Sequence, residues 1–475
     1  MDTSLDKDAL LEEASEVTSG QVNRLSNRRL LTLLSLFIVV LSIVLLSSVI
    51  AVLAVQPSSR SVDTTAPEQV HISATGDTSE MVVMWTTYGP TNHSIIHYGE
   101  HGTNLTNTIH GEMVEFMDGG GRHIVRYMHT VTLTGLKLAT KYDYIVGCSD
   151  NWSKTFTMTT LNNGTNWSPR LAIYGDMGSA NAHALPSLKA LTNAGQFDAI
   201  LHIGDFAYDL ASADGSIGDK FMNKIQVLAT QIPYMTAPGN HENAYNFSHY
   251  IHRFTMPGGH ANFYYSWDLG NAHFVVFSTE VYYYTEYGGV ELIEQQYNWL
   301  EQDLKEVNSR EERPWVITAG HRPMYCSLKD HHDCTHRNSR IRTGYSSSHL
   351  YALELLFYKY GVDIELWAHE HEYQRLWPVY NRTVYKGSEE EPYVDPKAPV
   401  HFITGSAGCE EMHKRFDHMM PWDAAHFFDF GYSYMTIVNS THVKWQQISD
   451  EHSKVIDEVH IVRNNKYPIW METNL

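Results

Sequence analysis

The sequence predicts a β-sandwich followed by an α/β domain, with a transmembrane helix in front of both. Three features support this order: a long uncharged segment near the N-terminus, a stretch of short β-branched runs, and then apolar runs that alternate with helical patterns. Strands that alternate with helices are typical of a sheet covered by helices. The chain has 475 residues, which is long enough for two such domains.

The uncharged segment is expected to cross a membrane. Residues 30–55 contain no charge and would span about 39 Å as a helix, which exceeds the roughly 30 Å of a bilayer core. Arg24, Arg28 and Arg29 precede the segment, so the positive-inside rule predicts that residues 1–29 form a cytoplasmic tail. A cleaved signal peptide is the alternative, although its apolar region is usually shorter.

Sorting features suggest where such a protein would reside. Leu10 and Leu11 follow the acidic Asp6 in a pattern that resembles the signal read by endolysosomal sorting adaptors, while a plain polar tail is the alternative. Residues 56–66 are polar and are expected to form a stalk. We therefore expect a single-pass type II membrane protein with a luminal or extracellular body, endolysosomal or at the cell surface, with a secreted protein as the alternative.

Glycosylation signals agree with a luminal or extracellular body. Eight Asn-x-Ser/Thr sequons follow the apolar segment and none precedes it. They lie at Asn92, Asn104, Asn151, Asn163, Asn166, Asn246, Asn381 and Asn439. Cys326 and Cys334 enclose a short loop and could form a disulfide in an oxidising compartment. The sequence leaves the pairing of Cys148 and Cys409 open.

The charge of the chain excludes one class of partner. The formal net charge is −20 with histidine neutral, which argues against nucleic acid. The 28 histidines would make the chain less negative in an acidic compartment. The oligomeric state cannot be predicted from these features.

The stretch from 67 to 160 has the pattern of a β-sandwich. Residues 81–87 are apolar and β-branched around Trp85, and residues 129–133 alternate between polar and apolar side chains. This stretch resembles a fibronectin type III-like domain, in which Trp85 would anchor the core of the sandwich.

Residues 168–450 are expected to form the α/β domain, and residues 451–475 a C-terminal tail. Five apolar runs in this domain are each followed by a residue that can bind metal. The runs are 170–174, 199–203, 233–237, 314–319 and 362–367, and they lead to Asp176, Asp205, Asn240, His321 and His369 respectively. Ligands of α/β sheets gather beyond the carboxyl ends of the strands. Residues 294–307 and 350–360 have helical periodicity.

The chemistry of these side chains predicts two metal ions. Tyr208 and His371 extend the set to seven donors. Carboxylate and phenolate oxygens favour a hard trivalent ion, whereas imidazoles suit divalent zinc, iron or manganese. His369 and His371 are two residues apart on an extended segment, so both side chains would point the same way. Each motif alone is weak, but five of them at strand ends are specific.

These motifs resemble those of the purple acid phosphatases, which belong to the binuclear metallophosphoesterases. The matching segments are Gly175-Asp176, Gly204-Asp205-x-x-Tyr208, Gly239-Asn240-His241-Glu242, Gly320-His321 and Ala368-His369-x-His371. The resemblance covers roughly residues 67–447 and implies an αββα metallophosphoesterase sandwich behind the fibronectin-like domain. Ala368 stands where the family usually has glycine, which concerns the local backbone more than metal binding.

The resemblance also implies the roles of the ligands. Asp176, Tyr208 and His371 would bind Fe(III), and Asp205 would bridge the two ions. Asn240, His321 and His369 would hold the divalent ion, which is zinc, iron or manganese.

The activity implied by the resemblance is that of an acid phosphatase, in which a metal-activated hydroxide attacks a phosphate monoester. His241 is expected to contact the phosphate, and His331 or His332, within the Cys326–Cys334 loop, to protonate the leaving group. A phosphodiesterase or pyrophosphatase with the same centre is one alternative, and a catalytically inactive, membrane-anchored binding module is another. The tyrosine cluster at 281–289 is either a specificity loop or packing.

Overall fold

The computed structural model describes residues 63–327, 333–346, 348–409 and 419–472. The predicted adaptor signal at Leu10 and Leu11, the predicted membrane segment 30–55 and most of the predicted stalk lie outside these ranges, as do His331 and His332. Within these ranges, no helix combines the length and the apolar character that a bilayer crossing requires.

An antiparallel β domain comes first. Its strands follow the order β1-β2-β5-β4-β3-β6-β7, with β8 paired to β6. They are β1 (Glu68–Ser73), β2 (Met81–Thr87), β3 (Ser94–Glu100), β4 (Asn107–Met117), β5 (Val125–Leu133), β6 (Lys141–Cys148), β7 (Asn151–Trp152) and β8 (Phe156–Thr159). Strand β4 pairs with both β3 and β5, and so joins the two halves of the sheet. Their shared core contains Trp85 and Tyr144, so the predicted core position of Trp85 is confirmed.

Two sheets form the second, mixed α/β domain. The first sheet has the order β11-β10-β9-β21-β22-β23, in which β9, β10 and β11 are parallel. Its strands are β9 (Arg170–Tyr174), β10 (Ala199–Ile203), β11 (Tyr234–Ala237), β21 (Gly431–Asn439), β22 (His442–Ser449) and β23 (Lys454–Val462). Strands β9, β10 and β11 are fully or almost fully buried, as their continuous apolar runs predict.

The second sheet has the order β12-β13-β14-β15-β19-β16-β20, with β13, β14, β15 and β19 parallel. Its strands are β12 (Tyr265–Leu269), β13 (Ala272–Val276), β14 (Trp315–Ala319), β15 (Ile364–Trp367), β16 (Tyr373–Leu376), β19 (Val400–Thr404) and β20 (Asp423–Phe427). A two-stranded ribbon, β17 (Val379–Tyr380) and β18 (Thr383–Val384), lies outside it.

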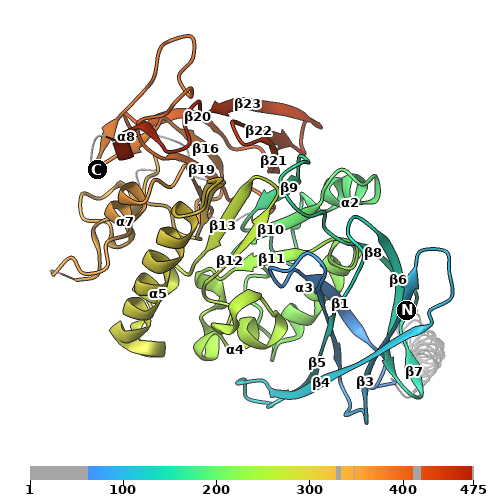
Figure 1. Ribbon diagram of the computed structural model, residues 1–475. Coiled ribbons are helices and arrows are strands. Elements are labelled where there is room, and N and C mark those ends of the chain that lie inside the picture. Colours follow the sequence, from blue (N-terminus) through green and yellow to red (C-terminus); the bar gives the residue numbers. More distant parts are fainter. Residues whose placement is uncertain (1–62, 328–332, 347, 410–418, 473–475) are drawn as a thin grey trace, which may run out of the picture. The chain divides into compact units, whose positions relative to one another are not determined.

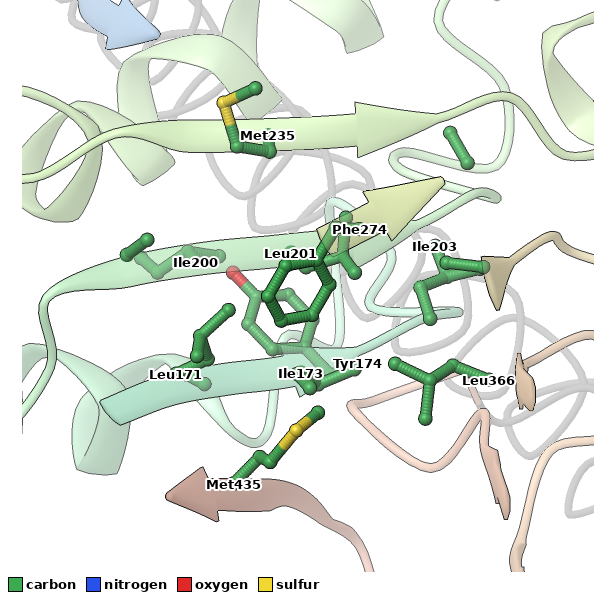
Figure 2. Packing of buried hydrophobic residues seen from close by; sticks show 14 of the residues in the cluster. Leu171, Ile173, Tyr174, Ile200, Leu201, Ile203, Met235, Phe274, Leu366 and Met435 are labelled. Carbon is green, nitrogen blue, oxygen red and sulfur yellow. The ribbon is translucent and has the colours of Figure 1, made fainter. Parts of the chain in front are cut away.

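The two sheets share one hydrophobic core. Phe274 and Leu366 of the second sheet belong to the same cluster as Leu171, Ile200 and Met435 of the first, as Figure 2 shows. Side chains alternate between the faces of a strand. Val275 and Val316 accordingly lie in a second cluster with α5 and α7, on the other face of their sheet.

The helices lie on the outside of this arrangement (Figure 1). They are α2 (Leu185–Asn193), α3 (Ser216–Ala229), α4 (Ala244–Arg253), α5 (Thr285–Asn308), α6 (Arg340–Thr343), α7 (Leu353–Lys359) and α8 (Ile469–Glu472). The predicted helical segment 294–307 lies within α5, which buries Ile293, Leu300, Leu304 and Val307 at helical spacing. The predicted segment 350–360 contains α7.

The C-terminal region corrects one expectation. Residues 454–462, which the sequence analysis placed in a tail, form β23 and pair with β22 at the edge of the first sheet. An edge strand has neighbours on one side only, and most of β23 is exposed or half-buried. Four of its nine residues are polar or charged, so the strand lacks the continuous apolar run that marks the buried strands.

Candidate metal centre

All seven candidate ligands lie beyond the carboxyl ends of parallel strands. Asp176 follows β9, Asp205 and Tyr208 follow β10, and Asn240 follows β11 in the first sheet; His321 follows β14, and His369 and His371 follow β15 in the second. Because the two sheets pack face to face, their strand ends bring donors from both sheets to one place.

One group of donors centres on His321. Its Nε2 lies 3.2 Å from Asp205 Oδ2, from Asn240 Oδ1 and from His369 Nδ1. His321 Nδ1 donates to the Ile203 carbonyl at 2.9 Å, so Nε2 is the nitrogen that can bind a cation once it has lost its proton. Asp205, His321 and His369 can place their ligand atoms around one ion. The N/O composition of this group fits a divalent transition metal.

A second group centres on the Tyr208 hydroxyl. This oxygen lies 2.9 Å from Asp176 Oδ1 and 2.9 Å from His371 Nε2. The buried side chain of Cys409 also forms hydrogen bonds with Tyr208 and His371. A carboxylate and a phenol together fit a hard, highly charged cation.

The backbone links the two groups. The His369 N–H donates to Asp176 Oδ2 at 2.9 Å, and the His241 N–H donates to Asp205 Oδ1 at 2.9 Å. The seven donors thus form one hydrogen-bonded network. Their atom types suit two cations that lie side by side.

Four candidate ligands have a left-handed backbone. The φ angles are 58° at Asp176, 51° at Asp205, 52° at Tyr208 and 67° at His369. Such conformations cost about 1–3 kcal/mol each for residues other than glycine and tend to cluster at functional sites. The surrounding fold therefore holds these side chains in positions that a relaxed turn would not give.

Close contacts explain the small residues of the motifs. A Cβ on Gly204 would lie 2.6 Å from His321 Nδ1, and a Cβ on Gly239 would lie 2.2 Å from Asp205 Oδ1. A Cβ on Gly175 would lie 2.4 Å from the Cβ of Ala368. The methyl group of Ala368 thus fits because residue 175 is glycine.

Nearby carboxylates raise the pKa values of the candidate histidine ligands, so protons occupy the nitrogens that would bind cations. Burial would lower the pKa of His321, but the carboxylates of Asp205 and Asp176 outweigh it and raise the pKa to about 10. Burial likewise lowers the pKa of His371, but the hydrogen bond that its ring donates to the Asp176 carboxylate, together with the Cys409 contact, raises the pKa to about 12. Burial raises the pKa of Asp205, yet the charge of His321 keeps it well below its usual range. Cation binding must therefore displace protons.

Of the three candidate catalytic histidines, His241 lies among the described residues. His241 Nε2 lies 3.9 Å from Asp205 Oδ2, while its Nδ1 contacts the carboxylate of Asp209. Burial lowers the pKa of His241, and Asp209 and Asp205 together raise it to about 9. His331 and His332 lie outside the described residues.

The predicted disulfide closes the loop that contains those two histidines. Cys326 and Cys334 are bonded, with their Cα atoms 5.4 Å apart. Cys148 and Cys409 are both buried and are not disulfide-bonded in the described part of the chain, so they do not pair with each other.

Sequence reasoning missed two residues of the centre, Glu242 and Asp209. The Glu242 carboxylate accepts the backbone N–H groups of Asp205 at 2.8 Å, Phe206 at 3.1 Å and Gly239 at 2.9 Å. The acidic residue directly after His241 was a usable signal for Glu242. Asp209 directly follows the candidate ligand Tyr208, but its partner His241 lies at another strand end, so the pairing could not be predicted from the sequence.

Similarity to known proteins covers most of the described residues. Residues 67–160 match the family "Purple acid Phosphatase, N-terminal domain", residues 169–373 match "Calcineurin-like phosphoesterase", and residues 398–458 match "Iron/zinc purple acid phosphatase-like protein C".

Two mammalian relatives and one solved structure extend this similarity. "Acid phosphatase type 7" of Mus musculus is 50% identical over 400 residues, covering 84% of this chain and 91% of that protein. The Homo sapiens protein of the same name is 49% identical over 401 residues, with the same two coverages of 84% and 91%. The purple acid phosphatase PPD1 of yellow lupin is 22% identical with a TM-score of 0.72, and the match covers 85% of this chain and 76% of that one.

Proposed function

Because the chain belongs to the purple acid phosphatase family of calcineurin-like metallophosphoesterases, we propose that it hydrolyses phosphate monoesters at a two-metal centre. The observation that carries this proposal is the convergence of seven oxygen and nitrogen donors from two sheets into two adjacent groups. A binding module without catalysis would have no need for two adjacent groups of metal-binding donors.

The donor chemistry supports an assignment of the two ions. The oxygen-rich group of Asp176, Tyr208 and His371 would hold Fe(III), and Asp205 would be shared by the two ions. Zinc, iron or manganese is assigned to Asn240, His321 and His369. When bound, the two cations orient the ester and supply a hydroxide at acidic pH.

The protein's own residues complete the chemistry. Asp209 holds Nδ1 of His241, so Nε2 is directed toward the centre. The pKa of His241 is about 9, so at a lower pH its imidazole is a cation. The cation donates a hydrogen bond to a phosphate oxygen. Protonation of the leaving alkoxide is assigned to His331 or His332 in the disulfide-closed loop.

The proposal also includes the three predicted regions of the chain. They are a fibronectin type III-like domain over residues 67–160, an αββα catalytic domain that begins at residue 168 and includes β23, and a membrane anchor over 30–55 with a luminal or extracellular body. Seven of the sequon asparagines are exposed, which supports glycosylation there. Asn151 is half-buried, and its amide donates to Thr65 Oγ1 at 3.1 Å.

Metal analysis with a visible spectrum and an assay of para-nitrophenyl phosphate tests the proposal. The wild-type protein should contain iron and a second metal, and Tyr208→Phe should lose the visible charge-transfer band while the protein stays folded. His371→Ala should lose iron and at least about a hundredfold in kcat. The exposed His452 provides the control, since His452→Ala should retain metal and activity.

Other outcomes would point to the alternatives. A folded wild-type protein that holds neither metal and hydrolyses nothing would favour an inactive, membrane-anchored binding module. A protein that prefers bis(para-nitrophenyl) phosphate would favour the phosphodiesterase reading.

A further inference from the structure

Arg322 directly follows the candidate ligand His321, and its guanidinium lies beside the candidate ligand His369. Its Nη1 lies 3.2 Å from His369 Nε2, and its Nε donates to both carboxylate oxygens of Glu280 at 3.0 Å. Glu280 is fully buried, whereas 18% of the Arg322 side chain is exposed. The buried Glu280 carboxylate thus fixes the Arg322 guanidinium next to the candidate metal ligands. Part of the Arg322 side chain still faces solvent.

The tyrosine cluster at 281–289 also holds this guanidinium. Arg322 Cζ lies 4.4 Å from the centre of the Tyr283 ring, and Arg340 Cζ lies 5.1 Å from the centre of the same ring. The Tyr283 hydroxyl donates to the carboxylate of Asp333, which lies in the disulfide-closed loop. Arg322 therefore has little freedom to move away from the centre.

The position of one proton on His369 decides what Arg322 can bind. His369 Nδ1 is one of the atoms that converge with His321 Nε2. A ring nitrogen that binds a cation carries no proton, so a neutral His369 then keeps its proton on Nε2. Arginine can only donate hydrogen bonds, so its Nη1 then has no acceptor on that ring. An anion in front of the centre would supply the acceptor.

We propose that Arg322 binds an unesterified oxygen of the substrate phosphate and so selects phosphate monoesters over diesters. This inference rests on the proposed phosphatase function. A monoester offers three unesterified oxygens and close to two negative charges near neutral pH, whereas a diester offers two oxygens and one charge. A fixed guanidinium forms strong, often bidentate hydrogen bonds with such oxygens, so it favours the monoester.

The test needs variants that stay folded. Arg322→Gln alone leaves the Glu280 carboxylate buried without its partner, which is destabilising. The double variant Arg322→Gln/Glu280→Gln removes both charges, and Glu280→Gln alone reports the effect of the second change. Arg340→Gln is the matched control, because it removes a guanidinium from the Tyr283 ring but not the one beside His369.

Each variant is prepared with metal, and its metal content is measured. Steady-state kinetics with para-nitrophenyl phosphate and bis(para-nitrophenyl) phosphate then give kcat/KM for a monoester and a diester, and calorimetry gives the Kd of orthophosphate. In the double variant, kcat/KM for the monoester should fall about tenfold to a hundredfold, and the Kd of orthophosphate should rise by a similar factor. Its diester activity and metal content should match those of Glu280→Gln, and Arg340→Gln should behave as wild type.

Three results would overturn the inference: equal losses on both esters, an unchanged Kd for orthophosphate, or a loss of metal relative to Glu280→Gln. The last result would make Arg322 a support for a ligand rather than a contact of the substrate. A wild-type protein that hydrolyses neither ester would instead refute the proposed function, while orthophosphate binding would still decide the role of Arg322.

Discussion

At the residue scale, the chemistry of the centre depends on side chains that hold other side chains. The ring of His241 can rotate about its side-chain bonds. The Asp209 carboxylate contacts Nδ1 and so directs Nε2 toward the centre. The same carboxylate raises the pKa of the imidazole against the effect of burial. A change at residue 209 should therefore act through His241.

We expect Asp209→Asn to narrow the pH range of activity. Without the Asp209 charge the pKa of His241 falls below its present value of about 9, so the cationic form is lost at a lower pH. The alkaline limb of the pH profile of kcat/KM should move to lower pH, and Asp209→Glu should largely restore it. An alkaline limb that stays in place in Asp209→Asn would separate Asp209 from the function of His241.

At the scale of elements, the turns that follow the strands hold the candidate metal ligands in place. Glu242 connects the turn after β10 to the turn after β11, because its carboxylate accepts N–H groups from both. These turns carry Asp205, Tyr208 and Asn240. Both carboxyl oxygens accept these N–H groups, while burial and the charge of Asp205 raise the pKa of Glu242 to about 8.

Glu242→Gln should accordingly weaken metal binding without direct contact to a metal. An amide accepts through one oxygen only and brings two N–H groups toward backbone donors, so the turns should shift. Loss of an outer-shell partner of this kind costs about tenfold to a hundredfold in metal affinity. Competition with a chelator measures the effect, with the exposed Glu286→Gln as a control. Retention of metal equal to wild type would show that the turns hold their shape without Glu242.

At the scale of the whole molecule, a buried ionic cluster joins the β domain to the α/β domain. Asp219 of α3 accepts hydrogen bonds from Arg126 of β5 at 2.7 and 2.8 Å, from Arg253 of α4 at 2.9 Å and from Gln69 of β1 at 3.2 Å. Burial would raise the pKa of Asp219, but the two guanidinium groups lower it below its ordinary value.

This cluster should stabilise the protein in acid as well as at neutral pH. Because the folded pKa of Asp219 is lower than the unfolded one, its stabilisation is present above about pH 4 and is lost as the pH falls through the folded pKa. Asp219→Asn leaves two buried guanidinium groups without a counter-charge and should cost about 3–5 kcal/mol.

Urea unfolding at pH 5 and pH 7 measures this loss. Asp214 pairs with the exposed Arg122, so Asp214→Asn is the matched control and should cost much less. Equal losses in the two variants would mean that the buried cluster contributes no more than an exposed ion pair.

The sequence by itself determined the parts of this protein that depend on local pattern. Apolar runs of strand length fixed where β9, β10, β11, β14 and β15 lie, and each run ended next to its candidate ligand, as Asp176 and His321 illustrate. The short spacing of Cys326 and Cys334 suggested their disulfide for the same reason. These features need only neighbours in the chain and the periods of helix and strand.

Only the tertiary structure decided which donors meet. Asp205 and His321 come from different sheets, and their 3.2 Å contact exists because the sheets pack face to face. The contact of Asp209 with His241 and that of Arg322 with His369 also join separate strand ends. No periodicity encodes such pairs, because long-range packing sets their distances.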